Sequence, residues 1–199
     1  MTFNHLILIG GGHSNALLIR KWAMRPELRP EGPITIISRD SHLVYSAMFP
    51  SVIAKRISLE KCLIDIAGLA ISAKISFIKE EVKDIDFYKK RIYLNNRLNI
   101  KYSKLILNFG SQTKISKEFT DLVTNKTAFP IKPFCQAYRL IKCEDQYDRS
   151  DVMPFVVVGS GLAAIEMIFA LRKRWPKRSL VLVCKKNKIP KKVLYRLHK

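Results

Sequence analysis

Two glycine-rich turns contain the residues whose types and spacing are best suited to chemistry. Residues 10–12 (Gly-Gly-Gly) follow the apolar run Leu6–Ile9, and residues 159–161 (Gly-Ser-Gly) follow Phe155–Val158. In such a turn the first glycine permits a tight bend, the second lets the backbone approach a pyrophosphate, and a small third residue lets the helix pack on the strand. One glycine trio is equally consistent with a structural bend, but two copies predict one nucleotide site in each half of the chain.

Each turn lies between a predicted strand and a predicted helix, so that the N–H groups at the start of the helix face a bound phosphate. Both units have the order strand, helix, strand: Leu6–Ile9, Ser14–Met24 and Ile34–Ile37 in the first, and Phe155–Val158, Ile165–Arg174 and Ser179–Val183 in the second. Parallel strands joined by a helix need a right-handed crossover. The sequence therefore predicts two βαβ units.

The region between these units contains further short apolar runs. From Ile75 to Leu94 they surround the polar turn Tyr88–Lys90 and predict a small antiparallel excursion. Lys104–Leu107 predicts another buried strand. A helix is expected from Pro133 to about residue 148, and the polar stretch Asp145–Asp151 is interpreted as a linker.

Three segments resemble the superfamily of FAD- and NAD(P)-binding pyridine nucleotide oxidoreductases, which includes the pyridine nucleotide-disulfide oxidoreductases. They are Leu6–Ser14, Ser38–Pro50 and Lys104–Ser111. Within the superfamily they resemble the type II NADH dehydrogenase-like branch, and most closely the flavoprotein module found fused to selenide, water dikinase. The resemblance covers nearly the whole chain, and its first 50 residues are the most specific.

The resemblance implies an α/β fold with two Rossmann-like lobes. We expect an FAD-binding lobe at 1–134, with a parallel sheet and the small antiparallel excursion, then a connecting helix and linker at 135–152. Residues 153–199 would form an incomplete NAD(P)-binding lobe with a basic tail. The family's later segments, including one that contacts the flavin ribityl chain, have no counterpart in this sequence, so we expect weak FAD affinity.

The resemblance also implies cofactor-binding roles around both turns. For FAD these residues are Gly10, Gly11, Gly12, His13, Ser14, Asn15, Arg39 near the adenosine, Tyr45 and Pro50 near the isoalloxazine, and Gly110; for NAD(P)H they are Gly159, Gly161, Ala164, Glu166 and Lys185. Core packing under a loop is an equal alternative for Tyr45 and Pro50. For His13 and His42 a structural role is favoured, because hydride transfer to a flavin needs no general base from the protein. No catalytic residue is assigned.

Several positions depart from the family pattern. Asn15 stands where a third glycine is usual, and we expect it to push the helix slightly off the strand. The acid that usually contacts the adenosine ribose is replaced by Ser38 in the first unit and by Cys184 in the second. Because Lys185 follows Cys184, any nicotinamide site should prefer NADPH, whose 2′-phosphate a cation tolerates. No C-x-x-x-x-C motif follows the first helix, so disulfide reductase chemistry is not expected.

Composition excludes other classes of protein. The 199 residues include four cysteines without a C-x-x-C pair and four histidines not spaced to join them, so no metal site is expected. Met153–Leu171 approaches membrane-spanning length but contains Glu166 and a glycine turn, so no transmembrane helix is predicted. The start of the chain lacks the basic region of a signal peptide. We expect a reduced cytoplasmic protein, with a peripheral position on a membrane as the alternative.

The net charge of +20 is concentrated near the end of the sequence. From residue 172 onward all charged side chains are basic: Arg172, Lys173, Arg174, Lys177, Arg178, Lys185, Lys186, Lys188, Lys191, Lys192, Arg196 and Lys199. Such a patch could attract an anionic lipid surface or a phosphorylated cofactor, but a solvated lysine-rich surface is favoured. Because no nucleic-acid motif accompanies the charge, specific nucleic-acid binding is not expected.

Two functions from different classes follow. The first is an FAD-dependent NAD(P)H oxidoreductase that passes electrons to an acceptor such as a quinone. The second is a non-catalytic nucleotide-binding remnant, or a subunit that needs a partner chain, whose basic tail binds an anionic partner. Two parallel strands and one helix cannot cover both faces of a sheet. We therefore expect the sheet of the second unit to pack on the first lobe, on another copy of the chain, or on a partner polypeptide that supplies the missing half.

Overall fold

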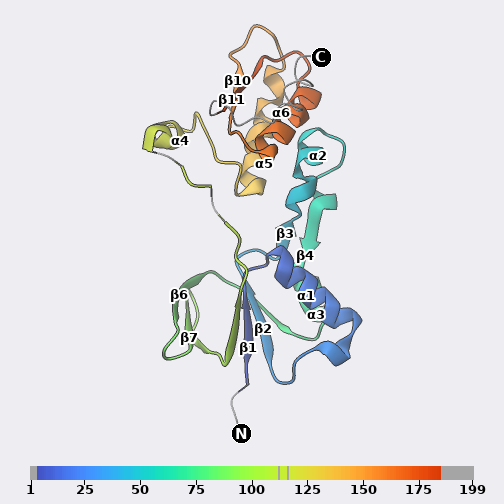
Figure 1. Ribbon diagram of the computed structural model, residues 1–199, viewed down its shortest axis with the longest axis vertical. Helices are drawn as coiled ribbons and strands as arrows, with labels where there is room; N and C mark the ends of the chain where they lie inside the picture. Colours follow the sequence, from blue (N-terminus) through green and yellow to red (C-terminus); the bar gives the residue numbers. More distant parts are fainter. Residues whose placement is uncertain (1–3, 112, 116, 185–199) are drawn as a thin grey trace. The chain divides into compact units, whose positions relative to one another are not determined.

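The computed structural model describes residues 4–111, 113–115 and 117–184 (Figure 1). The chain divides into two compact units. The first unit comprises residues 1–45 and 63–112, and the second comprises residues 46–62 and 113–199. Residues of the predicted FAD-binding lobe, 1–134, therefore occur in both units, and the functional boundary at residue 134 stays a prediction.

A four-stranded parallel sheet forms the centre of the first unit, which confirms the predicted fold class. Its strand order is β5 (Ser76–Lys79), β2 (Ile34–Ser38), β1 (Leu6–Ile9) and β9 (Lys104–Leu107). The prediction of β5 as part of the antiparallel excursion was wrong, since Phe77 lies opposite Ile36 in a parallel pair. The reason is a helix that the sequence pattern did not reveal: α3 (Ile66–Ser72) provides the crossover that a parallel strand requires.

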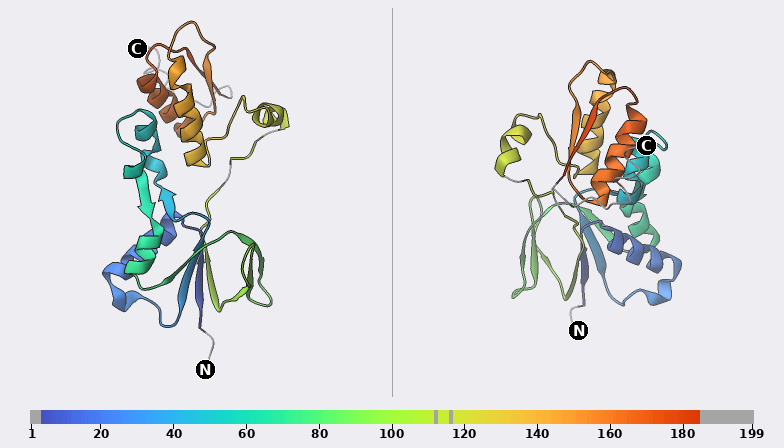
Figure 2. Two further views of the ribbon diagram at one scale, coloured as in Figure 1. Left: turned by 180° about the vertical axis from the view of Figure 1, so that it is seen from behind. Right: turned by 45° about the horizontal axis from the view of Figure 1, so that its top comes forward.

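Both faces of this sheet are covered, which explains why its strands are apolar throughout. On one face Leu6 and Leu8 pack with Ile19 and Trp22 of α1 (His13–Met24) and with α3. On the other face Ile7 and its neighbours pack against an antiparallel sheet of β6 (Val82–Asp86), β7 (Arg91–Leu94) and β8 (Ile100–Lys101). Figures 1 and 2 show these layers, with α1 and α3 on one side of β1 and β2, and β6 and β7 on the other. The predicted antiparallel excursion is thus confirmed for β6 and β7, and β8 extends it beyond the predicted range.

Smaller elements connect the main ones. β3 (His42–Val44) pairs antiparallel with β4 (Leu63–Asp65) in the first unit. The short helices are η1 (Pro26–Leu28), η2 (Ser46–Met48), η3 (Glu60–Cys62), η4 (Lys117–Phe119), α4 (Thr120–Thr124) and η5 (Glu144–Tyr147). Apart from η5, which lies inside the predicted helix of residues 133–148, these elements were not predicted from the sequence, because each is too short to show a periodic apolar pattern.

The second unit contains the predicted second βαβ motif. β10 (Phe155–Val158) and β11 (Leu180–Val183) pair in parallel, and α6 (Leu162–Arg174) connects them. The helix α6 begins three residues before the predicted start, because Gly161 is its N-cap. The helix α2 (Phe49–Ile53) packs against α6, and α5 (Phe134–Cys143) packs against α2. The rings of Phe49 and Phe134 lie 4.6 Å apart and join α2 to α5.

The stretch predicted as a linker is bonded within the second unit. The helix expected to run to about residue 148 ends at Cys143 and continues as the 3-10 helix η5. Carboxylates of this stretch then accept hydrogen bonds from the end of α6 and the loop after it, including those from the N–H groups of Lys177 and Arg178 to Asp148. Residues 144–148 therefore hold the crossover helix in place.

Candidate functional site

The first glycine turn requires glycine at its first position. Gly10 has φ +89°, a conformation that side chains with a Cβ rarely adopt. Its N–H donates to the carbonyl of Ile37 at 2.8 Å, which joins the turn to the end of β2. A Cβ added at Gly10 would lie 2.5 Å from Cα of Phe109, just beyond the end of β9. The turn is thus enclosed between two neighbouring strands, as its predicted role requires.

The helix after this turn presents an open N-terminus. Gly12 is the N-cap of α1 and has no side chain to accept from the helix, so the N–H groups of the first turn are free to bind an external acceptor. The first turn contains no acidic residue that would repel an anion. The N–H of Gly12 donates to the carbonyl of Asn108 at 3.1 Å, and the Asn108 side chain lies against the Cα of Gly12. This end of α1 is therefore suited to an anionic group.

Asn15 was expected to push the helix slightly off the strand, and its contacts show that this expectation was wrong. Its side chain is fully buried, and its Nδ2 donates to the carbonyl of Gly10 at 2.7 Å and to that of Ile9 at 3.3 Å. The amide thus joins α1 to the turn. Its Oδ1 is buried and has no partner among the described residues, and the same holds for Nε2 of His13. Buried polar atoms usually have a hydrogen-bond partner, so these two atoms set this turn apart from the rest of the unit.

The other residues of the first unit that were predicted near FAD lie on neighbouring segments. Ser38, in place of the usual acid, ends β2, and its Oγ would lie 3.0 Å from a Cβ added at Gly11. Arg39 is largely exposed and pairs with Asp40 at 3.4 Å. The Tyr45 ring lies 5.2 Å from the ring of His13. Gly110 has φ +77° and open space around its Cα.

The second glycine turn repeats this geometry in the second unit. The N–H of Gly159 donates to the carbonyl of Val183 at 2.8 Å. A Cβ at Gly159 would lie 3.0 Å from Cβ of Ala164, so the small residue predicted at the third position is needed for close packing. Gly161 differs, because it has an extended backbone (φ −87°, ψ 169°) and a Cβ there would meet nothing within 4 Å. The space in front of Gly161 is therefore open to a ligand.

Three other predicted residues are less closely tied to a turn. Glu166 is exposed on α6, one turn after the helix begins. Pro50 lies in the first turn of α2, in the same unit as the second glycine turn. Lys185, with the predicted preference for NADPH, lies outside the described residues. The first unit thus contains the glycines of the first turn together with His13, Ser14, Asn15 and Tyr45. The second unit contains the residues of the predicted nicotinamide turn.

An ion-pair network that sequence reasoning missed holds the end of α6. Arg174, whose side chain is 2% exposed, donates to both oxygens of Asp145 at 2.6 and 2.8 Å and to the carbonyl of Ile53 at 3.1 Å. Asp145 also accepts from Nε1 of Trp175 at 2.9 Å and pairs with Lys55 at 3.1 Å. Burial raises the pKa of Asp145, but the hydrogen bonds from these partners outweigh it and hold that pKa below its ordinary value.

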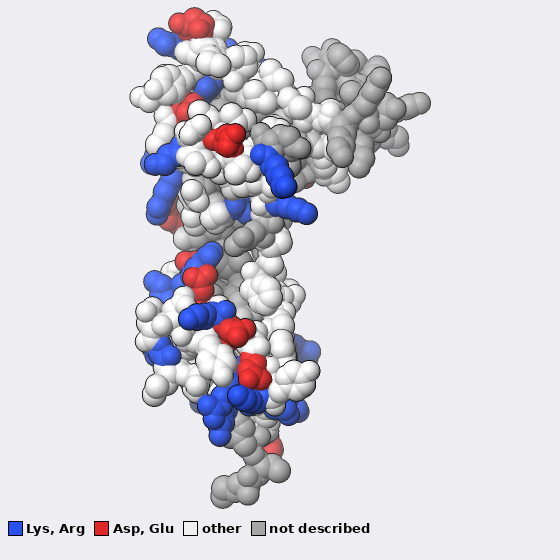
Figure 3. All heavy atoms as spheres, turned by 90° about the vertical axis from the view of Figure 1, so that its left-hand side faces the viewer, with Lys and Arg blue, Asp and Glu red and all other residues white. Residues whose placement is uncertain are grey.

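Up to residue 184, further contacts correct the expectation that the basic tail is a solvated surface, while its seven basic residues from Lys185 onward lie outside the described residues. Arg178 is 7% exposed, pairs with Glu144 at 2.8 Å and lies over the rings of Phe155 and Trp175. Arg172 donates to three backbone carbonyls in the loop after α6. Three of the basic residues in the part of the chain that the structure describes therefore serve the fold. On the face shown in Figure 3, basic and acidic side chains are interspersed.

The described ranges 4–111, 113–115 and 117–184 contain all four cysteines of the chain. The four cysteines are free, and burial raises the pKa of the Cys62 thiol. In these ranges no cluster of three or more His, Cys, Asp or Glu side chains could hold a metal ion. None of the helices there has the length and apolar character needed to cross a membrane.

A parallel βαβ motif with a glycine turn after its first strand is the arrangement of dinucleotide-binding α/β proteins, and this chain contains it twice. The chain belongs to the pyridine nucleotide-disulphide oxidoreductase family, whose family model matches residues 4–192. Members of this family are FAD-containing oxidoreductases that use NAD(P)H. No curated protein matches the sequence.

Solved structures share the fold at low sequence identity. Reduced CoADR-RHD from Bacillus anthracis is 20% identical with a TM-score of 0.77, covering 96% of this chain and 34% of that one. NADH:rubredoxin oxidoreductase from Clostridium acetobutylicum is 21% identical with a TM-score of 0.67, covering 90% of this chain and 44% of that one. Sulfide:quinone oxidoreductase from Aquifex aeolicus is 20% identical with a TM-score of 0.68, with coverages of 92% and 43%. This chain thus spans less than half the length of each.

Proposed function

We propose that this chain binds FAD at its first glycine turn and NAD(P)H at its second, and acts as an FAD-dependent NAD(P)H oxidoreductase. When bound, FAD supplies the chemistry, because it accepts a hydride from the nicotinamide and passes the electrons to an acceptor such as a quinone. Family membership supports the cofactor pair. The observation that favours the FAD position is the pair of buried polar atoms without partners, Oδ1 of Asn15 and Nε2 of His13, at the start of α1.

The residues of the first turn would divide the work of binding FAD. The open N–H groups at residues 13–15 would donate to the pyrophosphate, and the helix dipole would favour its charge. Arg39 would lie near the adenosine, while Tyr45 and Gly110 would border the cofactor. In the second unit Gly161 would let the nicotinamide nucleotide approach the backbone, with Gly159 and Ala164 shaping the turn. The further proposed contacts are Pro50, Glu166 and Lys185.

A specific surface favours the second candidate function, a nucleotide-binding subunit that needs a partner. One face of the β10–β11 sheet presents four valines that are 41–56% exposed: Val156, Val158, Val181 and Val183. Contiguous apolar surface of this kind marks an interaction site. In this case a second copy or another polypeptide would cover the valines and complete the enzyme. A cytoplasmic location, with the protein bound peripherally to an anionic membrane surface as the alternative, stays part of the proposal.

The direct test is anaerobic reduction of FAD bound to the purified chain. Addition of NADPH is expected to bleach the flavin absorption, and a quinone is expected to restore it. The subunit alternative predicts that FAD binds but that NADPH does not bleach it until the partner is added. A folded chain that binds neither nucleotide would contradict both functions.

Gly161→Val is expected to weaken NADPH binding by about 10-fold or more without lowering the thermal midpoint, a loss worth about 1.4 kcal/mol. The backbone at Gly161 accepts any residue, and the added Cβ has no neighbour within 4 Å. The valine would instead fill the space that the nucleotide phosphates need. Calorimetric titration with NADPH measures the effect, and Met153→Val, at an exposed residue of the same unit, is the control. Unchanged affinity in folded Gly161→Val would place the nucleotide elsewhere.

A further inference from the structure

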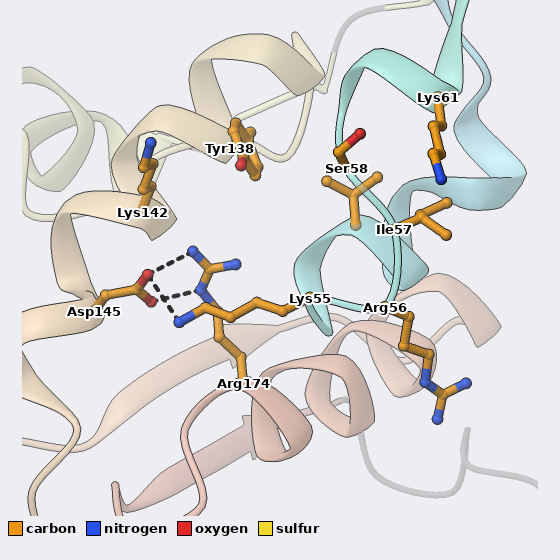
Figure 4. Close-up of a pocket in the computed structure, with 10 residues that line it drawn as sticks. Lys55, Arg56, Ile57, Ser58, Lys61, Tyr138, Lys142, Asp145 and Arg174 are labelled. Carbon is orange, nitrogen blue, oxygen red and sulfur yellow. Dashed lines mark hydrogen bonds and ion pairs between the residues drawn. The ribbon is translucent and has the colours of Figure 1, made fainter.

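A cavity that contains no residue of either glycine turn lies within the second unit. Its volume is about 580 Å³, and it is lined by the end of α2, the loop that follows, α5 and the end of α6. Figure 4 shows Tyr138 and Lys142 of α5 on one side and Ile57, Ser58 and Lys61 of the loop on the other. The family resemblance and the cofactor proposal leave this cavity without a role.

The lining of the cavity is strongly basic. Five cations contribute to it, and they are Lys55, Arg56, Lys61, Lys142 and Arg174. Asp145 is the acid in the lining, and it is already bonded to Arg174 and Lys55. Among the described residues, the other three cations have no carboxylate within 4 Å. Lys61 and Lys142 are therefore available to a ligand from opposite walls.

Neighbouring negative charges do not cancel this excess. Glu60, beside the cavity, is exposed; its bonds are to its own backbone and to Ser58, and Lys142 exerts only a weaker Coulombic attraction on it. The helices α2, α5 and α6 all end at the cavity, and each helix C-terminus is equivalent to about half a negative charge. The three helix C-termini contribute about −1.5 charges, and the carboxylates of Asp145 and Glu60 contribute about −2. Together they offset about 3.5 of the five positive charges. An anion in the cavity would relieve the remaining repulsion among the cations.

We propose that this cavity binds a small organic phosphate, independently of the flavin and nicotinamide sites. Its volume falls within the range of about 300–1,000 Å³ typical of sites for small organic ligands, and it is far larger than a phosphate ion needs. Val52, Ile57 and the ring of Tyr138 form an apolar wall for the organic part. Lys61 and Lys142 hold the phosphate, while Asp145 keeps Arg174 and Lys55 in place below it. The apolar wall beside the basic residues favours a small organic phosphate over an extended polyanion or a membrane.

Phenyl phosphate is the probe, because it combines a phosphate with an aromatic ring for Tyr138 and lacks the nucleotide part that the glycine turns would recognise. Calorimetric titration of the intact chain is expected to show one saturable site. Lys61→Gln and Lys142→Gln should each weaken it by about 10-fold or more, because each removes a charge-assisted hydrogen bond. Inorganic phosphate should bind more weakly than phenyl phosphate, and raised salt should weaken both.

Lys101→Gln, on an exposed strand residue of the first unit, is the matched control and should leave the affinity unchanged. Three results would overturn the proposal: no binding to the folded chain, equal losses in all three variants, or tighter binding of single-stranded DNA or anionic phosphatidylserine vesicles that depends on the same lysines. Because neither lysine belongs to a glycine turn, FAD binding should be unaffected by Lys61→Gln and Lys142→Gln. A failure of the phosphate-site proposal can thus be distinguished from a failure of the oxidoreductase proposal.

Discussion

Asp145→Ala is expected to lower the free energy of unfolding by about 3 kcal/mol at neutral pH. The substitution leaves the Arg174 guanidinium, whose side chain is 2% exposed, without its carboxylate. It also removes the acceptor of the Trp175 indole and the partner of Lys55. Because Asp145 itself is 29% exposed, the lower end of the range for broken buried pairs applies. Urea denaturation followed by circular dichroism measures the loss.

The same pair predicts a dependence on pH. The folded-state pKa of Asp145 lies below its ordinary value of 3.8, so the stabilisation is present above that value and is lost as the pH falls through the folded pKa. The difference between wild type and Asp145→Ala should therefore shrink below about pH 4. Asp151→Ala is the control, because Asp151 pairs with Arg149 on the surface with both side chains more than 60% exposed. An equally large loss in Asp151→Ala would contradict this account. So would a loss in Asp145→Ala that does not change with pH, because the ionised carboxylate of Asp145 would then not be the stabilising group.

Gly10→Ala is expected to cost about 3–5 kcal/mol, because strain in the left-handed region adds to steric overlap. Gly10 has φ +89°, and the added Cβ would lie 2.5–2.6 Å from backbone atoms of residues 108 and 109. Gly110→Ala separates the two causes, since Gly110 has φ +77° but open space around it. That control should cost only about 1 kcal/mol. Equal losses in the two variants would mean that the end of β9 does not enclose the turn.

The parts of the fold that could be predicted are those with a local signal. β1, β2, β9 and the strands of the second βαβ motif are apolar runs, of which β1 and β10 precede glycine turns, and the structure confirms them. β5 was assigned to the wrong sheet because four residues show no direction of pairing, and the helix α3 that makes it parallel has only seven residues. Pairing direction depends on the connection, which short segments do not reveal.

The candidate site was predictable in its glycines but not in its polar contacts. The positive φ of Gly10 and the contact of Gly159 with Ala164 follow from the motif. The role of Asn15 was missed, because a larger residue at a small-residue position indicates a clash unless its amide is seen to bond the turn. Arg174 and Asp145 are 29 residues apart, with no spacing pattern that links them. Only the packing of α6 against η5 brings them together.

The claim that the first glycine turn binds FAD is tested most directly by titrating the folded chain with FAD and comparing Ser14→Asp. Ser14 is exposed in the first turn of α1, where an added carboxylate favours the helix but repels a pyrophosphate. Wild type and Ser14→Ala should bind one FAD per chain with perturbed flavin absorption. Ser14→Asp should be as stable as wild type but bind about 10- to 100-fold more weakly. FAD binding that is equal in all three proteins, or absent from folded wild type, would contradict the assignment.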